Sequence, residues 1–285
     1  MSRELLLFAE IPFTALDVRY QTLPPPPALA GMVRMYWAFE ISGLNGQEYV
    51  YRSLADGCAE IVFHYRSQFD DLTESDPVPP SFSHLHAQTQ RFRRFVTSCD
   101  FGIFGAYLYP HALPILFGHS AASLTDQMPT LQEALGRAGT ELEERIMLAP
   151  DNHCRATILS DFLLTRLDSN KGPNPSIEWA IRRLFQTNGQ IPISKLTDQT
   201  GYSLRHLERH FHNFAGFTPK RLARVLRFQS ATKARDMGLR SLTEIALDCG
   251  YYDQAHFIHD FRQFSGYTPS AYFHGRPEGI EYRET

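Results

Sequence analysis

The last third of the chain contains two copies of one pattern, and this repeat constrains the fold more than any other feature. The first copy spans Leu196–Pro219 and the second spans Ile245–Pro269. With one residue inserted in the second copy, the matched positions are Gly201 and Gly250, Tyr202 and Tyr251, Leu207 and Phe257, Phe211 and Phe261, Phe214 and Phe264, Gly216 and Gly266, and the two Thr-Pro pairs at 218–219 and 268–269. Each copy is therefore expected to fold as the same structural unit.

Each copy predicts a helix, a turn opened by glycine, and a second helix. Glycine tolerates the left-handed backbone that ends a helix, so Gly201 and Gly250 are expected to end the first helices. In the first copy one face of the second helix is apolar, with Leu204, Leu207, Phe211 and Phe214. The opposite faces carry Arg205, Glu208, Arg209 and His212 in the first copy, and Gln254, Ala255, His256, His259 and Arg262 in the second. Such side chains suit base edges and phosphates, which predicts two helix-turn-helix units.

Capping signals predict helices throughout the chain from Ser176 onward. Ser176, Ser203 and Asp253 are expected N-caps, the two Thr-Pro pairs combine a cap with proline at the first helical position, and Ser241–Glu244 is a capping box. The predicted helices are Ile177–Gln186, Ile193–Thr200, Leu204–Asn213, Pro219 to about Asp236, Leu242–Asp248, Gln254–Phe264 and one opening at Pro269. The helix between the copies would span roughly 24 Å. With its flanking helices it could hold two recognition helices about one DNA turn, roughly 34 Å, apart.

The first 120 residues are predicted to be rich in β-structure. Short apolar and aromatic runs alternate with turn residues, which favours a barrel or sandwich. The runs expected to form strands are Val33–Ile41, Glu48–Leu54, Glu60–Tyr65, Gly102–Tyr109 and Leu113–Phe117. Residues 123–168 show helical spacing in two stretches separated by Pro150, so two helices are expected there. Ser169–Pro175 is the predicted linker.

Charge and cysteine content limit the classes of protein. Residues 174–275 carry a net charge of +5 and residues 1–173 a net charge of −7, so only the helical part is expected to meet a polyanion. The four cysteines, Cys58, Cys99, Cys154 and Cys249, form no CxxC pair, which argues against a zinc knuckle and fits a reducing compartment. The apolar run Leu5–Ala9 is too short for a signal peptide, so a cytoplasmic protein is expected.

Residues Pro192–Phe273 resemble the DNA-binding domain of AraC/XylS-type transcription regulators. The resemblance lies mainly in the second copy, in Ser-Leu-Thr-Glu-Ile-Ala at 241–246, Gly250-Tyr251, Asp253–Phe257, Phe261 and Gly266–Pro269. It implies a transcription factor with two helix-turn-helix units joined by a long helix. The family's base contacts would fall on Arg205, Glu208, Arg209, Gln254, Ala255, His256 and His259, and its backbone contacts on Ser203, Arg240 and Ser241. His259 stands where arginine is usual and Ala255 where serine is common, which predicts weaker or less specific contact by the second unit.

The front of the chain is similar to small β-barrel sensor domains of such regulators, in Leu54–His64 and Phe104–Pro110. The resemblance implies a two-domain α+β protein with a cupin-like β-barrel sensor at 1–120, helices that could pair two chains at 121–170, an all-α DNA-binding domain at 171–275 and a tail at 276–285. A small effector would contact Tyr36, Trp37, Phe63, Tyr65 and Phe104. The same aromatic residues could instead fill the core. Duplex DNA is the expected partner, and a homodimer and RNA polymerase are further hypotheses.

Two alternatives compete with this interpretation. His84 and His86 lie on one side of an expected strand and could ligate a metal, which would suit a metal-dependent cupin-type enzyme fused to a DNA-binding module. The glutamate usual in such sites is absent, and Gln90 stands in its place, so neither a metal site nor another cofactor is predicted and the chain is expected not to be an enzyme. The second alternative is a regulator without a ligand, in which the front domain only dimerises.

Overall fold

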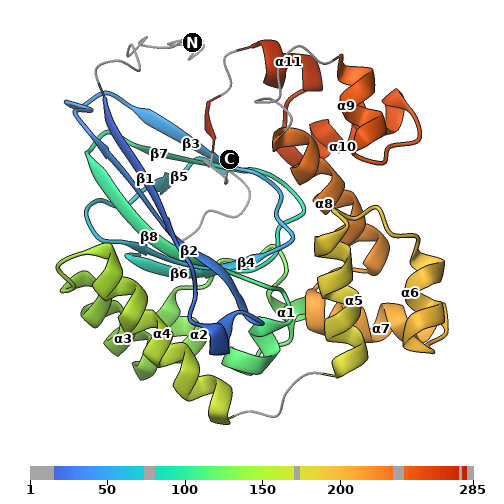
Figure 1. Ribbon diagram of the computed structural model, residues 1–285. Coiled ribbons are helices and arrows are strands. Elements are labelled where there is room, and N and C mark those ends of the chain that lie inside the picture. The colour runs from blue at the N-terminus through green and yellow to red at the C-terminus, as the bar shows by residue number, and fades with distance from the viewer. Residues whose placement is uncertain (1–15, 74–80, 170–173, 234–240, 276–277, 281–285) are drawn as a thin grey trace.

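The computed structural model describes residues 16–73, 81–169, 174–233, 241–275 and 278–280. Strands occupy the first part of the chain and helices most of the rest, with one short strand after the last helix, as expected for the predicted two-domain α+β fold (Figure 1). The strands are β1 (Asp17–Leu23), β2 (Val33–Ser42), β3 (Tyr49–Ser53), β4 (Ala59–His64), β5 (Asp70–Asp71), β6 (Ser83–His86), β7 (Arg93–Thr97), β8 (Phe101–Leu108) and β9 (Gly279–Ile280).

The strands form two open sheets and are not closed into a barrel, so of the two predicted arrangements, barrel or sandwich, the observed one is layered. One sheet has the order β1-β2-β8-β4-β6 and the other the order β5-β7-β3-β9. In the larger sheet β1 and β6 are edge strands. Beyond β6 lie a bridge between His84 and Thr130 and backbone hydrogen bonds from Leu85 and Ala87 to the carbonyls of Pro129 and Gln127. Apolar side chains such as Phe39, Val62 and Phe101 fill the space between the sheets, so the two sheets face each other as layers.

The segment Leu113–Phe117, predicted as a strand, is a buried π-helical turn. Pro114 lies within it and cannot donate to a sheet ladder, and Gly118 ends it with a φ of 72°. The two helices predicted over 123–168 are four: α1 (Ala121–Leu124), α2 (Leu131–Leu135), α3 (Arg137–Met147) and α4 (Asn152–Ser169). A capping box at Thr130 and the positive φ of Gly136 interrupt the first predicted helix.

Helices α2–α4 cover the outer face of the larger sheet (Figure 1). Tyr36, Phe63 and Phe104 point to this side and pack with helix residues that include Leu142 and Leu159. The hydroxyl groups of Tyr36 and Ser160 lie 2.7 Å apart, which ties β2 to α4. Residues 121–169 thus complete the core of the front domain.

The remaining helices are α5 (Pro175–Gln186), α6 (Ile193–Thr200), α7 (Leu204–Ala215), α8 (Pro219–Lys233), α9 (Leu242–Asp248), α10 (Gln254–Ser265) and α11 (Pro269–His274). The expected caps are present at Ser203, Thr218, Ser241, Asp253 and Thr268. The cap of α5 is Asn174 rather than Ser176, because Pro175 occupies the first helical position. The predicted linker and the end of the helix after Pro219 fall largely on residues 170–173 and 234–240, outside the described residues.

The core of the second helix-turn-helix unit predicts a stability effect. Phe261 is fully buried and packs edge-to-face on Phe228 of α8 and Phe257 of its own helix. We expect Phe261→Ala to lower the free energy of unfolding by about 3–5 kcal/mol, because the cavity is lined by large side chains. Urea denaturation measures this. The control Tyr252→Ala, at a residue 93% exposed, should stay within about 0.5 kcal/mol of wild type.

Candidate nucleic-acid interface

Helix α7 presents a polar face to solvent. Leu207, Phe211 and Ala215 are buried on one side, and Arg205 and Arg209 are exposed on the other. The Ser203 side chain accepts the backbone N–H of His206 at 3.4 Å, which fixes the start of the helix. Leu204, expected on the apolar face, is 51% exposed, so the buried face of this helix begins at Leu207.

Helix α10 repeats this arrangement with different side chains. Gln254, Ala255 and His259 are exposed, and His256 is half-buried. The Nε2 atom of His256 lies 3.6 Å and the Nδ1 atom of His259 lies 3.4 Å from a carboxylate oxygen of Asp260. The second unit therefore presents imidazoles beside a buried carboxylate, where the first presents guanidinium groups.

Most of the residues predicted to contact DNA lie on these two helices. Arg205, Glu208 and Arg209 lie on α7, and Gln254, Ala255, His256 and His259 lie on α10. Ser203 and Ser241 are exposed N-caps at the starts of α7 and α9. Arg240 lies outside the described residues. The fold thus gathers the described candidates on two helices and two helix N-termini.

Helix α8 joins the two units and holds α10 through a buried ion pair (Figure 1). The Nη2 atom of Arg224 donates to Asp260 Oδ1 at 2.5 Å and to Gln263 Oε1 at 3.1 Å. The Asp260 side chain is fully buried. Arg227 of the same helix donates to the carbonyl of Gly189, in the turn between α5 and α6, at 3.1 Å. These contacts fix α8 against α10 on one side and against the turn that precedes α6 on the other.

The front domain contacts the C-terminal ends of both recognition helices. The Oγ1 atom of Thr125, just after α1, donates to the carbonyl of Gly216 at 3.1 Å. The N–H of Ala55, between β3 and β4, donates to the carbonyl of Phe264 at 3.0 Å. The last carbonyls of a helix have no partner within the helix, so these donors satisfy groups that would otherwise need water. Gly216 and Gly266 occupy matched positions in the two units, and both lie against the front domain.

Arg52 of β3 is the centre of the contact at α10. Its Nη1 atom donates to the carbonyl of Ser265 at 3.0 Å, and its guanidinium lies over the rings of Phe92 and Tyr267, at 4.5 and 4.3 Å from their centroids. It also pairs with Glu278 at 2.8 Å, and Arg94 pairs with the same carboxylate. Burial alone would raise the pKa of Glu278, but the hydrogen bond from Arg94 and the charge of Arg52 outweigh it and hold that pKa below its usual value.

The C-terminal tail extends this contact, because β9 pairs in parallel with β3. Neighbouring residues of a strand point to opposite sides, so Arg52 faces the helices while Tyr51 and Ser53 line a cavity between the two sheets. Arg52 lies in no recognisable sequence motif. Its importance depends on contacts with residues more than 200 positions away.

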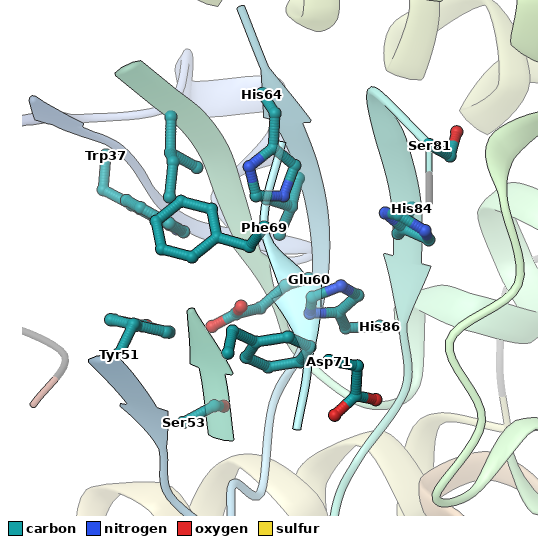
Figure 2. Close-up of a pocket in the computed structure, with 13 residues that line it drawn as sticks. Trp37, Tyr51, Ser53, Glu60, His64, Phe69, Asp71, Ser81, His84 and His86 are labelled. Atoms are coloured by element: carbon teal, nitrogen blue, oxygen red, sulfur yellow. The ribbon is translucent and has the colours of Figure 1, made fainter. Parts of the chain in front are cut away.

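The cavity between the sheets is the second candidate site (Figure 2). It is lined by Trp37, Tyr51, Ser53, Glu60, Val62, His64, Phe69, Asp71, Ser81, His84, His86, Phe95 and Ile103. Of the five aromatic residues predicted to contact an effector, only Trp37 lines it. Tyr36, Phe63 and Phe104 pack under the helices. The hydroxyl of Tyr65 donates to Glu40 at 2.5 Å, and the Tyr65 ring lies against Arg155.

His84 and His86 do line this cavity, together with His64. Within the described ranges, however, no group of three or more His, Cys, Asp or Glu side chains is arranged to hold a metal ion. Glu60, Val62 and His64 are alternate residues of β4, so their side chains point to the same side of the strand. This alternation can be read from the sequence and could have predicted that the three residues share one face.

Comparison with known proteins identifies the family. A model described as a helix-turn-helix domain matches residues 196–275, and a domain of unknown function (DUF6597) matches residues 21–129. The probable transcription factor PqrA of Proteus vulgaris is 32% identical over 99 residues, which are 35% of this chain and 80% of PqrA. The chain belongs to the AraC/XylS type of transcription regulators. It is thus a DNA-binding regulator with a helix-turn-helix domain, which favours this function over the enzyme alternative.

Other AraC/XylS-type relatives match over shorter parts of their length. The transcriptional activator RhaS of Escherichia fergusonii is 33% identical over 86 residues, 30% of this chain and 31% of RhaS. The xylDLEGF operon transcriptional activator of Pseudomonas putida is 32% identical over 126 residues, 40% of this chain and 39% of the activator. The chain therefore spans only about a third of these two relatives. The solved structure of ToxT from Vibrio cholerae matches 92% of this regulator and 98% of ToxT, with a TM-score of 0.47 and 9% identity.

One further property follows from the helices. In the part of the regulator that the structure describes, no helix has the length and apolar character needed to span a bilayer.

The ion pair between α8 and α10 predicts a linked effect on stability. Arg224→Met leaves the Asp260 carboxylate buried without its partner, and we expect the free energy of unfolding to fall by about 3–5 kcal/mol. Urea denaturation of the double variant Arg224→Met/Asp260→Asn should recover at least half of that loss. Equal stability of the single variant and the wild type would contradict the structural role of this pair.

Proposed function

We propose that the regulator reads duplex DNA with both recognition helices, α7 through Arg205, Glu208 and Arg209, and α10 through Gln254, Ala255, His256 and His259. Ser203, Arg240 and Ser241 would contact the DNA backbone at helix starts, where free amide groups favour phosphates. The observation that carries this assignment is the repeated helix geometry, with an apolar buried face and an exposed polar face in each unit. Arginine pairs with guanine through two hydrogen bonds, so the first unit should contribute most of the base selectivity.

The proposed division of labour is a DNA-binding domain at 171–275 and a sensor at 1–120, with the helices of 121–170 completing the sensor. A small effector would bind in the cavity between the sheets, where Trp37 is the one member of the predicted set. We assign the chain no catalysis, since its relatives are named as transcription regulators. Homodimer formation, contact with RNA polymerase and action in the cytoplasm are part of the same proposal.

Regulation would act through the contacts at the helix ends. A change at the sheets that moves the loop after β3 also moves the donor to Phe264 and the guanidinium at Ser265. The Nε2 atom of Gln229 in α8 donates to Asp56 of the same loop at 2.7 Å. An effector can shift the presentation of the recognition helices only if it binds the two arrangements with different affinity.

The test of DNA reading is selection of bound sequences from random duplex DNA by the full chain, at two salt concentrations. We expect one motif with two half-elements about a helical turn apart. Arg209→Ala should weaken binding by about 1–3 kcal/mol and relax the preference at one base position. The control Arg145→Ala, at an exposed arginine of α3, should change neither.

Unchanged affinity and preference in Arg209→Ala would remove this residue from the base contacts. A single enriched half-element would show that only one unit reads bases. Binding without any enriched motif, lost at higher salt, would reduce the domain to an electrostatic binder of phosphates.

The two tryptophans of the chain, Trp37 and Trp179, allow the contact between the domains to be tested. Trp37 lies in the front domain and Trp179 packs on the core of the helical domain. If the contact couples the domains, selected operator DNA at about 100 times its Kd should raise the free energy of unfolding reported by both residues by about 2.7 kcal/mol. Fluorescence of Trp37→Phe and Trp179→Phe variants during urea denaturation separates the two signals.

The double change Arg52→Met and Gln229→Met should reduce the operator-induced shift at Trp37 while leaving the shift at Trp179. Arg145→Ala is again the control. If, in the protein with Arg52 and Gln229 intact, operator DNA raised the free energy of unfolding at Trp179 but not at Trp37, the coupling would be contradicted.

A further inference from the structure

We propose that the first recognition helix carries a binding site for a divalent transition-metal ion such as Zn²⁺, with His206 and His210 of α7 as its protein ligands. Imidazole nitrogens are common ligands of such ions, and two histidines four residues apart lie on one face of a helix, close enough to bind the same ion. The geometry of the pair, its available nitrogen atoms and its contrast with the matched positions of α10 support the site. The inference goes beyond the proposed reading of DNA and does not depend on it.

The two imidazoles already lie side by side. The ring centroids of His206 and His210 are 4.4 Å apart, with an angle of 34° between the ring planes. A tetrahedral zinc ion requires its two bound nitrogens to be roughly 3.3 Å apart. Rings at the observed separation reach that distance by rotation of their side chains, without a change in the helix.

Packing against the preceding turn holds the pair in place. The ring of Tyr202 lies 4.5 Å from the ring of His206 and 6.0 Å from that of His210, centroid to centroid. The hydroxyl oxygen of Tyr202 accepts a hydrogen bond from Nδ2 of Asn174 at 2.7 Å, so this ring is tied to the start of α5. Ordering of flexible side chains opposes binding, and much of that ordering is present here before an ion arrives.

The ring nitrogens of the pair are available to an ion. Among the described residues, neither imidazole pairs with a carboxylate, and the ring nitrogens of His210 make no hydrogen bond. Nδ1 of His206 lies 3.4 Å from Nη2 of Arg209, a long contact at the exposed surface. This contact leaves Nε2 of His206 for the ion.

The matched positions of α10 use the same spacing for a structural bond. In the alignment of the two copies, His206 and His210 correspond to His256 and Asp260. The carboxylate of Asp260 is fully buried, bonds to Arg224 of α8 and lies 3.6 Å from Nε2 of His256. This position of α10 therefore already has its cation, in the guanidinium of Arg224. The pair on α7 is partly exposed and, among the described residues, has no comparable bond to α8, so it can take its cation from solution.

Two protein ligands make a site that exchanges its ion with solution. In the described ranges no third His, Cys, Asp or Glu side chain completes a group that could hold a metal, so water would fill the remaining positions of the ion. Structural zinc sites, in contrast, use four protein ligands. We therefore expect reversible binding with a Kd below about 1 mM, and folding that does not require the ion.

Isothermal titration calorimetry of the full chain with zinc chloride tests the site. We expect His206→Gln and His210→Gln each to raise the Kd at least about tenfold, because each removes one of two ligands. The control His212→Gln changes an exposed histidine on another face of α7 and should leave the Kd within about twofold of wild type. Arg209→Ala should bind Zn²⁺ at least as tightly as wild type, because it removes a positive charge beside the site.

Chemical modification locates the ion on the helix. Diethyl pyrocarbonate modifies accessible imidazoles, and mass spectrometry reports the extent at each histidine. At a Zn²⁺ concentration about ten times the Kd, modification of His206 and His210 should slow about tenfold. Modification of His212 should not change.

No saturable Zn²⁺ binding below about 1 mM, a Kd that is unchanged in both His206→Gln and His210→Gln, or equal protection of His212 would overturn the inference. None of these outcomes bears on the DNA motif that the regulator selects. Failure of the metal site and failure of the proposed DNA reading are therefore separate results.

Discussion

The contact between the front domain and the DNA-binding domain depends on the carbonyl groups at the C-terminal ends of α7 and α10. A helix leaves its last carbonyls without partners, and in this protein the front domain supplies donors to both recognition helices, from Thr125 at one and from Ala55 and Arg52 at the other. A positive guanidinium at a helix C-terminus also faces the negative end of the helix dipole. The recognition helices are therefore held at their C-terminal ends, while Arg205 of α7 and Gln254 of α10, near their N-terminal ends, remain exposed.

Strand β3 connects the cavity with this contact. Its alternation places Tyr51 and Ser53 in the cavity wall and Arg52 against α10, so one short strand belongs to both sites. The C-terminal tail adds β9 to the same strand and brings Glu278 to Arg52. A regulator of the AraC/XylS type could thus transmit an event between its sheets to its second recognition helix over the width of one strand.

The two recognition helices differ in chemistry although their backbones match. The first presents arginines to solvent, whereas the second presents histidines beside Asp260, a buried carboxylate that already bonds to Arg224. Asp260 therefore holds α10 on α8 and at the same time lies next to two candidate DNA contacts. One side chain thus both stabilises the second unit and lies beside two of the residues proposed to contact DNA.

The sequence by itself determined the helical half, because its signals are local: caps at Ser203, Ser241 and Asp253, proline after threonine, and apolar residues at helical spacing act within a few residues of each other. It also identified the family through the repeated pattern. Only the tertiary structure decided that the strands form two open sheets, that Leu113–Phe117 is helical, and that most of the predicted effector residues belong to the core under the helices. Sheet order and the face on which Tyr36 or Phe63 is buried depend on partners far along the chain. The role of Arg52 could not be predicted for the same reason, since its partners Ser265 and Glu278 reach it only when β3, α10 and the tail meet.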